Sequence, residues 1–211
     1  MSIDPEVGKA LMAEDNTMAR LVTLTDGVLS IAMTLLVLDI RLAMPADKLS
    51  NGELWQAILA IQPQIWSYCL SFLVIAVFWI NHAQKFRHLS KLSNLLVWLN
   101  VLFLLGVGMI PFTTSILAEN GNAVSTAIYA GVMAFASLML GLMSLYARIA
   151  GLADEAIDKG RLGLVIISQF STVAVFAVSI GVAFVNAEWA KYCWLLLIPF
   201  GFISRRNPKI A

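Results

Sequence analysis

Residues 20–40 of this chain form the stretch RLVTLTDGVLSIAMTLLVLDI. It is long enough to cross the hydrocarbon core of a bilayer as a helix, which takes about 20 residues. It nevertheless begins with Arg20 and carries a carboxylate, Asp26, about two turns further on. An ionisable group inside hydrocarbon costs about 3 kcal/mol or more. The presence of these two residues in an apolar span therefore indicates that they have polar partners on other helices or take part directly in the function of the protein.

The composition of the whole chain is typical of an integral membrane protein. Of its 211 residues, 60% are hydrophobic and only 13% are charged, whereas about a quarter of the residues in soluble domains are charged. A net charge of +1 argues against a nucleic-acid partner, because it cannot neutralise a row of phosphates. Residues 1–16 lack the basic start and short apolar core of a signal peptide, so we expect the first span to remain in the mature protein.

Apolar runs of about bilayer length recur between polar loops and predict an all-α membrane protein with six transmembrane helices. The expected spans cover about residues 20–41, 64–81, 92–117, 123–147, 162–185 and 189–203. A short apolar piece at 54–61 precedes the second span. The polar residues 119–122, with a central glycine, predict a tight turn between the third and fourth spans.

Lysine and arginine collect in alternate loops, which orients the bundle by the positive-inside rule. The residues concerned are Lys9, Arg20, Lys85, Arg87, Lys91, Arg148, Lys159, Arg161, Arg205, Arg206 and Lys209. Both termini are therefore expected in the cytoplasm, in a multi-pass protein of the cell (inner) membrane. The expected parts are a cytoplasmic segment at 1–16, a six-helix transmembrane domain at 17–204 and a cytoplasmic tail at 205–211.

One face of the first helix has a graded composition at about 100° per residue. From the cytoplasmic side outward it carries Thr23, Gly27, Ile31, Thr34 with Leu35, and Leu38. If several copies of this helix ringed an axis, the face would form a vestibule below a narrow apolar neck, and apolar constrictions can gate a pore or discriminate among ions. The alternative is that these side chains face lipid or neighbouring helices. The stretch has no second copy in the chain, so a pore requires several subunits.

Asp26 falls well off that face, so it is expected to point into the subunit and to find partners on other helices. We expect a buried polar network that holds the first helix at a fixed angle. Its expected members are Arg20, Thr25, Asp26, Trp79, Asn81, His82, Asn94 and Asn100. In the alternative interpretation Asp26 and His82 form a proton relay, as in a proton-coupled transporter of small solutes.

The sequence carries no pattern of catalytic residues. Two histidines, His82 and His88, are too few for several bis-histidyl haem pairs, and neither HExxH nor GxSxG occurs. Cys69 and Cys193 lie in different apolar segments without metal-ligand spacing. We therefore expect neither an enzyme nor a resident cofactor or metal ion.

Two motifs resemble those of a known family. Residues 20–26, RLVTLTD, are similar to the RxxxFSD signature of the transmembrane protein 175 family, with Leu24 in place of Phe and Thr25 in place of Ser. Residues 78–86, FWINHAQKF, resemble the FWxxHxxxF stretch at the end of the family's second helix. The length and the six expected helices also match one repeat of that family, so the resemblance covers nearly the whole chain.

The resemblance implies a potassium channel whose single-repeat members form homotetramers with the first helix lining the pore. In the family, bulky aliphatic side chains five, nine and twelve residues after the signature aspartate narrow the pore, and hydroxyls stand four and eight residues after it. The matching positions here are Ile31, Leu35 and Leu38 for the constriction and Ser30 and Thr34 for the hydroxyls. Permeant potassium and other monovalent cations, the lipid bilayer and further copies of the chain are the implied partners.

Overall fold

The structure, a computed structural model, describes residues 5–42, 49–153 and 159–195. Its helices in chain order are α1 (Pro5–Leu35), the 3-10 helix η1 (Leu36–Asp39), α2 (Asn51–Ala60), α3 (Gln62–Arg87), α4 (Asn94–Asn120), α5 (Ala123–Ile149), α6 (Lys159–Ala183) and α7 (Ala187–Leu195). Within those residues the chain forms helices and no strands, as predicted for an all-α protein.

Five helical segments of the described chain are long and apolar enough to cross a membrane. They are Asn16–Asp39, Gln62–Arg87, Asn94–Asn120, Ala123–Ile149 and Ile166–Ala183. The predicted multi-pass membrane protein is therefore confirmed. The sixth predicted span, 189–203, is described only in its first part, as α7, and its remainder lies outside the described residues.

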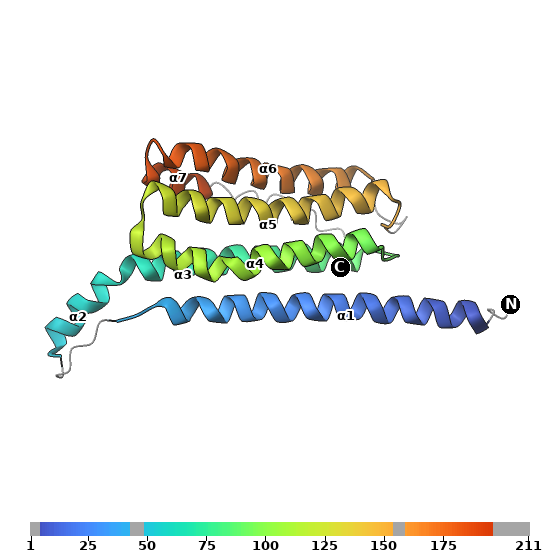
Figure 1. Cartoon of the computed structure of the whole chain (residues 1–211), viewed down its shortest axis with the longest axis horizontal. Coiled ribbons are helices and arrows are strands. Elements are labelled where there is room, and N and C mark those ends of the chain that lie inside the picture. Colours follow the sequence, from blue (N-terminus) through green and yellow to red (C-terminus); the bar gives the residue numbers. More distant parts are fainter. Residues whose placement is uncertain (1–4, 43–48, 154–158, 196–211) are drawn as a thin grey trace.

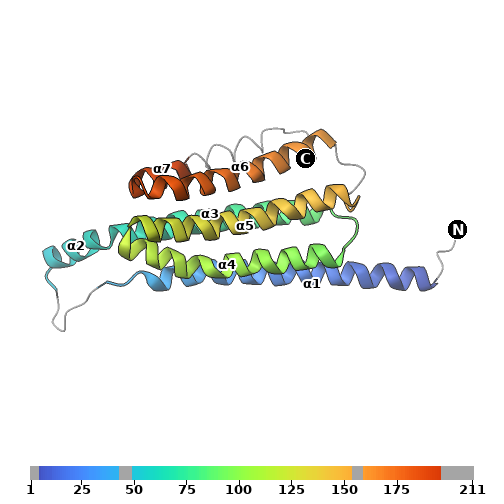
Figure 2. The ribbon, with the colours of Figure 1, turned by 45° about the horizontal axis from the view of Figure 1, so that its top comes forward.

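α1 lies at one side of the bundle. It packs against α3 and α4, while α5 packs between α4 and α6. Both views show α1 on the side of the bundle away from α6, with its N-terminal part extending past the other helices (Figure 1, Figure 2). α2 projects from the opposite end (Figure 1). This position leaves one face of α1 without a neighbour among the described residues.

α3 is longer than the sequence predicts. The second span was expected to end at about residue 81, but the helix continues to Arg87. The polar side chains of its last turns have partners on other helices: His82 bonds Asn100 of α4, and Lys85 donates to the carbonyl oxygen of Leu140 on α5. Because tertiary contacts satisfy these groups, polarity does not end the helix.

α4 and α5 approach closely at Gly106. A Cβ atom on this residue would lie 3.0 Å from Cδ1 of Phe135 and 3.2 Å from Cβ of Ala136. Gly108, one helical face away, would meet nothing within 4 Å. The absence of a side chain at Gly106 therefore sets how near the two helix axes lie, and van der Waals contact between close helices is a main source of stability in lipid.

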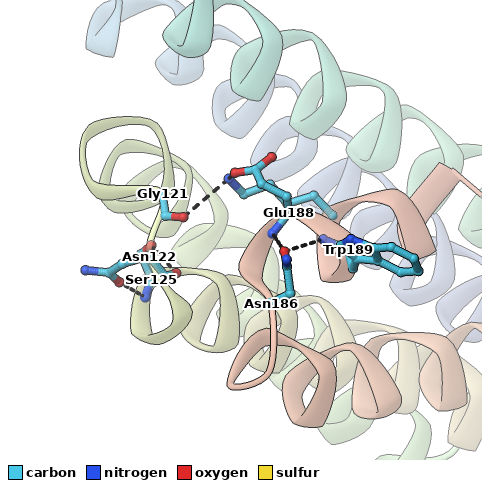
Figure 3. Close-up of polar contacts among 7 residues, drawn as sticks. Gly121, Asn122, Ser125, Asn186, Glu188 and Trp189 are labelled. Carbon is cyan, nitrogen blue, oxygen red and sulfur yellow. Dashed lines mark hydrogen bonds and ion pairs between the residues drawn. The ribbon is translucent and has the colours of Figure 1, made fainter.

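The turn predicted at residues 119–122 is confirmed. Gly121 ends α4 with φ 59°, a left-handed conformation that glycine adopts without a Cβ clash. Asn122 caps α5 and Asn186 caps α7, each by accepting backbone N–H groups on its side-chain oxygen (Figure 3). Lys191 donates to the carbonyl oxygen of Gly121 at 3.4 Å and to Glu188 at 2.7 Å. It thereby joins the two turns.

α2 begins earlier than the apolar piece predicted at 54–61, because a capping box precedes it. Ser50 accepts the backbone N–H of Glu53, and the Glu53 carboxylate accepts the Ser50 hydroxyl at 2.7 Å and its backbone N–H at 2.8 Å. The hydroxyl, followed by the backbone N–H, holds the pKa of Glu53 below its ordinary value of 4.5. The helix therefore starts at Asn51.

Candidate functional site

α1 has one buried face and one open face. The buried face repeats at intervals of three and four residues and consists of Leu21, Thr25, Leu29 and Ala32; it continues into η1 with Leu36. The open face is centred about 180° away, near Thr34. It includes Ile31 and, in the following 3-10 helix η1, Leu38. These two side chains are 58% and 65% exposed, whereas Leu29 and Leu36 are 0% and 1% exposed. The residues predicted to face a pore axis therefore lie on the open side of the helix.

The remaining residues of the predicted pore face are exposed as well. Leu35 is 44% exposed, and Ser30 and Thr34 are exposed beside it. The hydroxyl of Thr34 donates to the carbonyl oxygen of Ile31 at 2.9 Å. Because its hydrogen is used within the helix, the lone pairs of that oxygen are left to accept from water or to bind a cation. The open face therefore combines bulky aliphatic groups with oxygen ligands.

A chain of hydrogen bonds runs from α3 through α4 to the buried face of α1. Nε2 of His82 bonds Oδ1 of Asn100 at 2.9 Å, and Nδ2 of Asn100 donates to Oγ1 of Thr25 at 2.9 Å. The Thr25 hydroxyl donates to the carbonyl oxygen of Leu21 at 2.9 Å. Since Oδ1 of Asn100 only accepts, Nε2 of His82 carries a hydrogen and every donor in the chain points toward α1. All three side chains are fully buried.

Asp26 joins α1 to α3 through a second contact. Nε1 of Trp79 donates to Oδ1 of Asp26 at 2.9 Å. Asp26 is half-buried and Trp79 is 44% exposed, so this bond lies nearer the surface than the chain through Asn100. A hydrogen bond to an ionised acceptor is stronger than one between neutral groups. A bond from α4 to Thr25 and a bond from α3 to Asp26 therefore restrain the rotation of α1.

Three residues of the predicted network lie outside this cluster. Arg20 is exposed, Asn94 is exposed at the start of α4, and Asn81 is half-buried on α3 next to His82. Within the described part of the chain, none of their side chains bonds a member of the cluster. Asn94 precedes Asn100 by almost two turns of α4. Because α4 contacts α1 at the level of Asn100, only Asn100 belongs to the cluster.

His82 sits in an aromatic enclosure. Its ring stacks on Phe86 with a centroid distance of 4.3 Å and lies parallel to Phe103 at 5.8 Å. Its Nδ1 is buried and has no hydrogen-bond partner among the described residues. In that part of the structure no hydrogen bond joins His82 to Asp26, whose carboxylate bonds Trp79 instead. The two groups of the predicted proton relay therefore belong to separate contacts.

A second buried chain of hydroxyls was not predicted. Ser71 of α3 lies 2.8 Å from Oγ1 of Thr114 on α4 and 3.0 Å from the hydroxyl of Tyr129 on α5. Thr114 donates its hydrogen to the carbonyl oxygen of Ile110, so the donors run from Tyr129 through Ser71 to Thr114. Single hydroxyls in apolar spans usually bond their own helix, and no sequence pattern distinguishes those that reach another one.

The described residues contain no group of three or more histidine, cysteine, aspartate or glutamate side chains that could hold a metal ion. The two cysteines, Cys69 and Cys193, are free thiols on different helices. The polar side chains of the candidate site are instead used in bonds between helices. Chemically, the candidate site is one face of a helix that presents bulky aliphatic side chains and hydroxyl oxygens.

Comparison with known proteins identifies close relatives. The family model described as endosomal/lysosomal potassium channel TMEM175 matches residues 20–111, which carry α3 and most of α1 and α4. A potassium channel of Streptomyces collinus is 34% identical over 196 residues, or 89% of this chain and 93% of the relative. A potassium channel of Chamaesiphon minutus is 27% identical over 200 residues, or 90% of this chain and 97% of the relative.

A solved structure has the same fold. The crystal structure of a lysosomal potassium-selective channel TMEM175 homolog from Chamaesiphon minutus aligns with a TM-score of 0.78 at 24% identity, over 90% of this chain and 98% of that one. The Streptomyces relative, which is 34% identical and matches along almost its whole length, shows together with the family model that this chain belongs to the TMEM175 family, whose members are ion channels and not enzymes.

Proposed function

We propose that the chain is the subunit of a homotetrameric, potassium-permeable cation channel in which α1 lines the pore. The observation that carries the proposal is the open face of α1, where Ile31 and Leu38 are more than half exposed on a helix whose opposite face is fully buried. The names of its relatives in Streptomyces collinus and Chamaesiphon minutus, both potassium channels, support the choice of ion.

In this proposal Ile31, Leu35 and Leu38 form successive apolar rings around the axis. A cation passing an apolar ring must shed part of its hydration shell, and rings of this kind gate by dewetting. Thr34, between the rings, contributes hydroxyl oxygens that replace some of the lost water, with Ser30 on the cytoplasmic side. Potassium holds its hydration less tightly than sodium, so this arrangement favours potassium modestly.

The cluster behind the pore face has a structural role in the proposal. Thr25 and Asp26 connect α1 to Asn100 and Trp79, so the angle of α1, and with it the width of the apolar rings, is held by bonds inside each subunit. A functional surface keeps its geometry when the residues behind it are held rigidly. Arg20, Asn81 and Asn94 are proposed as weaker contributors at the margins of the cluster.

Cation flux through reconstituted protein tests the proposal. Liposomes carrying the wild type are expected to conduct potassium in preference to sodium. Ile31→Asn and Leu38→Ala should raise total conductance and reduce that preference, because both weaken an apolar ring. Leu105→Ala, a change at a 60% exposed leucine on α4, is the matched control and should leave flux unchanged. Unchanged conductance and selectivity in both pore variants would contradict the assignment of the constriction.

The alternative, a proton-coupled transporter of small solutes, makes a different prediction in the same liposomes. It requires saturable uptake driven by a pH gradient and lost in Asp26→Asn. In the described structure Asp26 and His82 bond different partners, which gives a relay between them no direct support. If the liposomes show saturable, pH-driven uptake of a solute and no electrogenic potassium flux, the protein is this transporter and not a channel.

A further inference from the structure

Exposed basic side chains gather at the end of the bundle where α3 and α5 finish. We call the group the basic platform: Arg87, His88, Lys91 and Arg148. All four are exposed, and in the described part of the chain none of their side chains is in an ion pair. Lys85, only two residues before Arg87, differs because it is half-buried and donates to a backbone carbonyl of α5. Among the described residues, the platform therefore consists of basic side chains without an acidic partner.

The two loops that carry the platform are bonded to each other. The carbonyl oxygen of Leu152 accepts the backbone N–H of Ser90 at 2.9 Å and its hydroxyl at 3.1 Å. Leu89 is buried and pairs with Ala153 in an isolated antiparallel bridge. Loops on a membrane surface usually move independently. Here the cross-links keep His88 and Lys91 at a fixed spacing from Arg148.

The lengths of α3 and α5 suit a position of the platform at the depth of the lipid headgroups. α3 and α5 have 26 and 27 residues, and at a rise of 1.5 Å per residue each is about 40 Å long. That length matches a bilayer including its headgroup regions, about 40–45 Å. Arg87 and Arg148 lie in the last turns of these helices. Ile149, next to Arg148, is 75% exposed, which suits the boundary between headgroups and acyl chains.

The guanidinium of Arg148 lies beside α6, so a ligand bound to it would also contact that helix. Its Nη1 lies 3.3 Å from the position that a Cβ would take on Gly163, so the guanidinium lies over a residue without a side chain near the start of that helix. A guanidinium presents paired N–H donors in a plane and binds phosphate oxygens two at a time. Its open side is therefore available to an anion at the membrane surface.

We propose that the basic platform binds the phosphate headgroup of an anionic phospholipid. Basic pockets between spanning helices, at the level of the headgroups, are a known mode of binding such lipids. Free phosphate has the same chemistry, but the exposed Ile149 beside the charges and the position at headgroup depth favour a ligand with an acyl chain. The proposal is independent of the pore, because no residue of the open face of α1 takes part.

Lipid binding to the full-length protein in a neutral detergent tests the proposal. Phosphatidylglycerol, phosphatidylcholine and inorganic phosphate are titrated separately, and bound molecules are counted by native mass spectrometry. The wild type should retain phosphatidylglycerol in preference to both others. The double variant Lys91→Gln/Arg148→Gln should bind it more than about tenfold more weakly, since each basic residue near an anionic surface contributes about a fivefold effect.

Two further variants separate the platform from general charge and from misfolding. Arg41→Gln removes an exposed basic residue at the other end of the bundle and should bind as the wild type does. Lys91→Arg/Arg148→Lys keeps both charges and should retain binding. Equal phosphatidylglycerol affinity in the wild type and the double glutamine variant would overturn the proposal. Displacement of the lipid by inorganic phosphate at equal concentration would instead assign the site to a free anion and also overturn it.

Discussion

Asn100 is the residue through which α1, α3 and α4 meet. It is fully buried, accepts from His82 and donates to Thr25. Its side-chain amide is the one group in this chain of bonds that both accepts from one helix and donates to another. Removal of such a central member leaves partners on two helices unsatisfied, whereas removal of a terminal member leaves one.

The first prediction concerns stability at this residue. Asn100→Ala leaves the Nε2–H of His82 without an acceptor in a buried site, and each unsatisfied buried group costs about 1–3 kcal/mol. We expect the midpoint of thermal unfolding of the purified protein to fall clearly. Asn94→Ala, at an exposed position of the same helix, should change the free energy of unfolding by about 0.5 kcal/mol or less. Equal midpoints for the two variants would show that the hydrogen-bond chain contributes nothing.

At the scale of elements, the contact between α4 and α5 depends on Gly106. The neighbouring atoms of Phe135 and Ala136 belong to a helix held on its other side by α6. A methyl group at this position therefore has no easy way to displace its neighbours. The same helix offers Gly108, where the added atom meets open space.

The second prediction compares these two glycines. Gly106→Ala should lower the free energy of unfolding by about 1–3 kcal/mol, the usual cost of overpacking. Gly108→Ala should leave it unchanged or raise it by up to about 1 kcal/mol, because alanine is the better helix former. Thermal unfolding in one detergent measures both. A Gly106→Ala protein as stable as Gly108→Ala would mean that the two helices do not approach as closely as described.

At the scale of the whole molecule, the open face of α1 is not covered by any other described part of the chain. One chain contributes one such helix, so a pore built from it requires an assembly. Ile31 then lies near the corresponding residue of the other copies. Leu105 of α4 is 60% exposed and stands about 140° around that helix from Asn100, the residue that bonds α1.

The third prediction is the assembly itself. Native mass spectrometry of the purified protein should give the mass of four chains. In a background without the two native cysteines, Ile31→Cys should be crosslinked between subunits by a short bismaleimide, while Leu105→Cys should not. A monomeric mass, or equal crosslinking at both positions, would contradict a pore formed by α1.

Some features of this protein followed from local patterns in the sequence. The membrane-length segments of α1, α4 and α5 were predicted to within a few residues, because the length and composition of an apolar run are properties of the run alone. The start of α1 at Pro5, well before the predicted start at Arg20, was not predicted. The separation of the open face of α1 from Asp26 also followed from the helical period. The use of that face in conduction stays a prediction.

Only the tertiary structure decided which polar groups meet. The sequence proposed eight members for the network, and the structure joins Thr25 to Asn100 and His82, and Asp26 to Trp79, while Asn94 stands apart. The end of α3 and the partners of Ser71 were likewise set by contacts with other helices. The physical reason is that periodicity is local, whereas the partner of a buried polar side chain depends on the depth and rotation at which two helices pack.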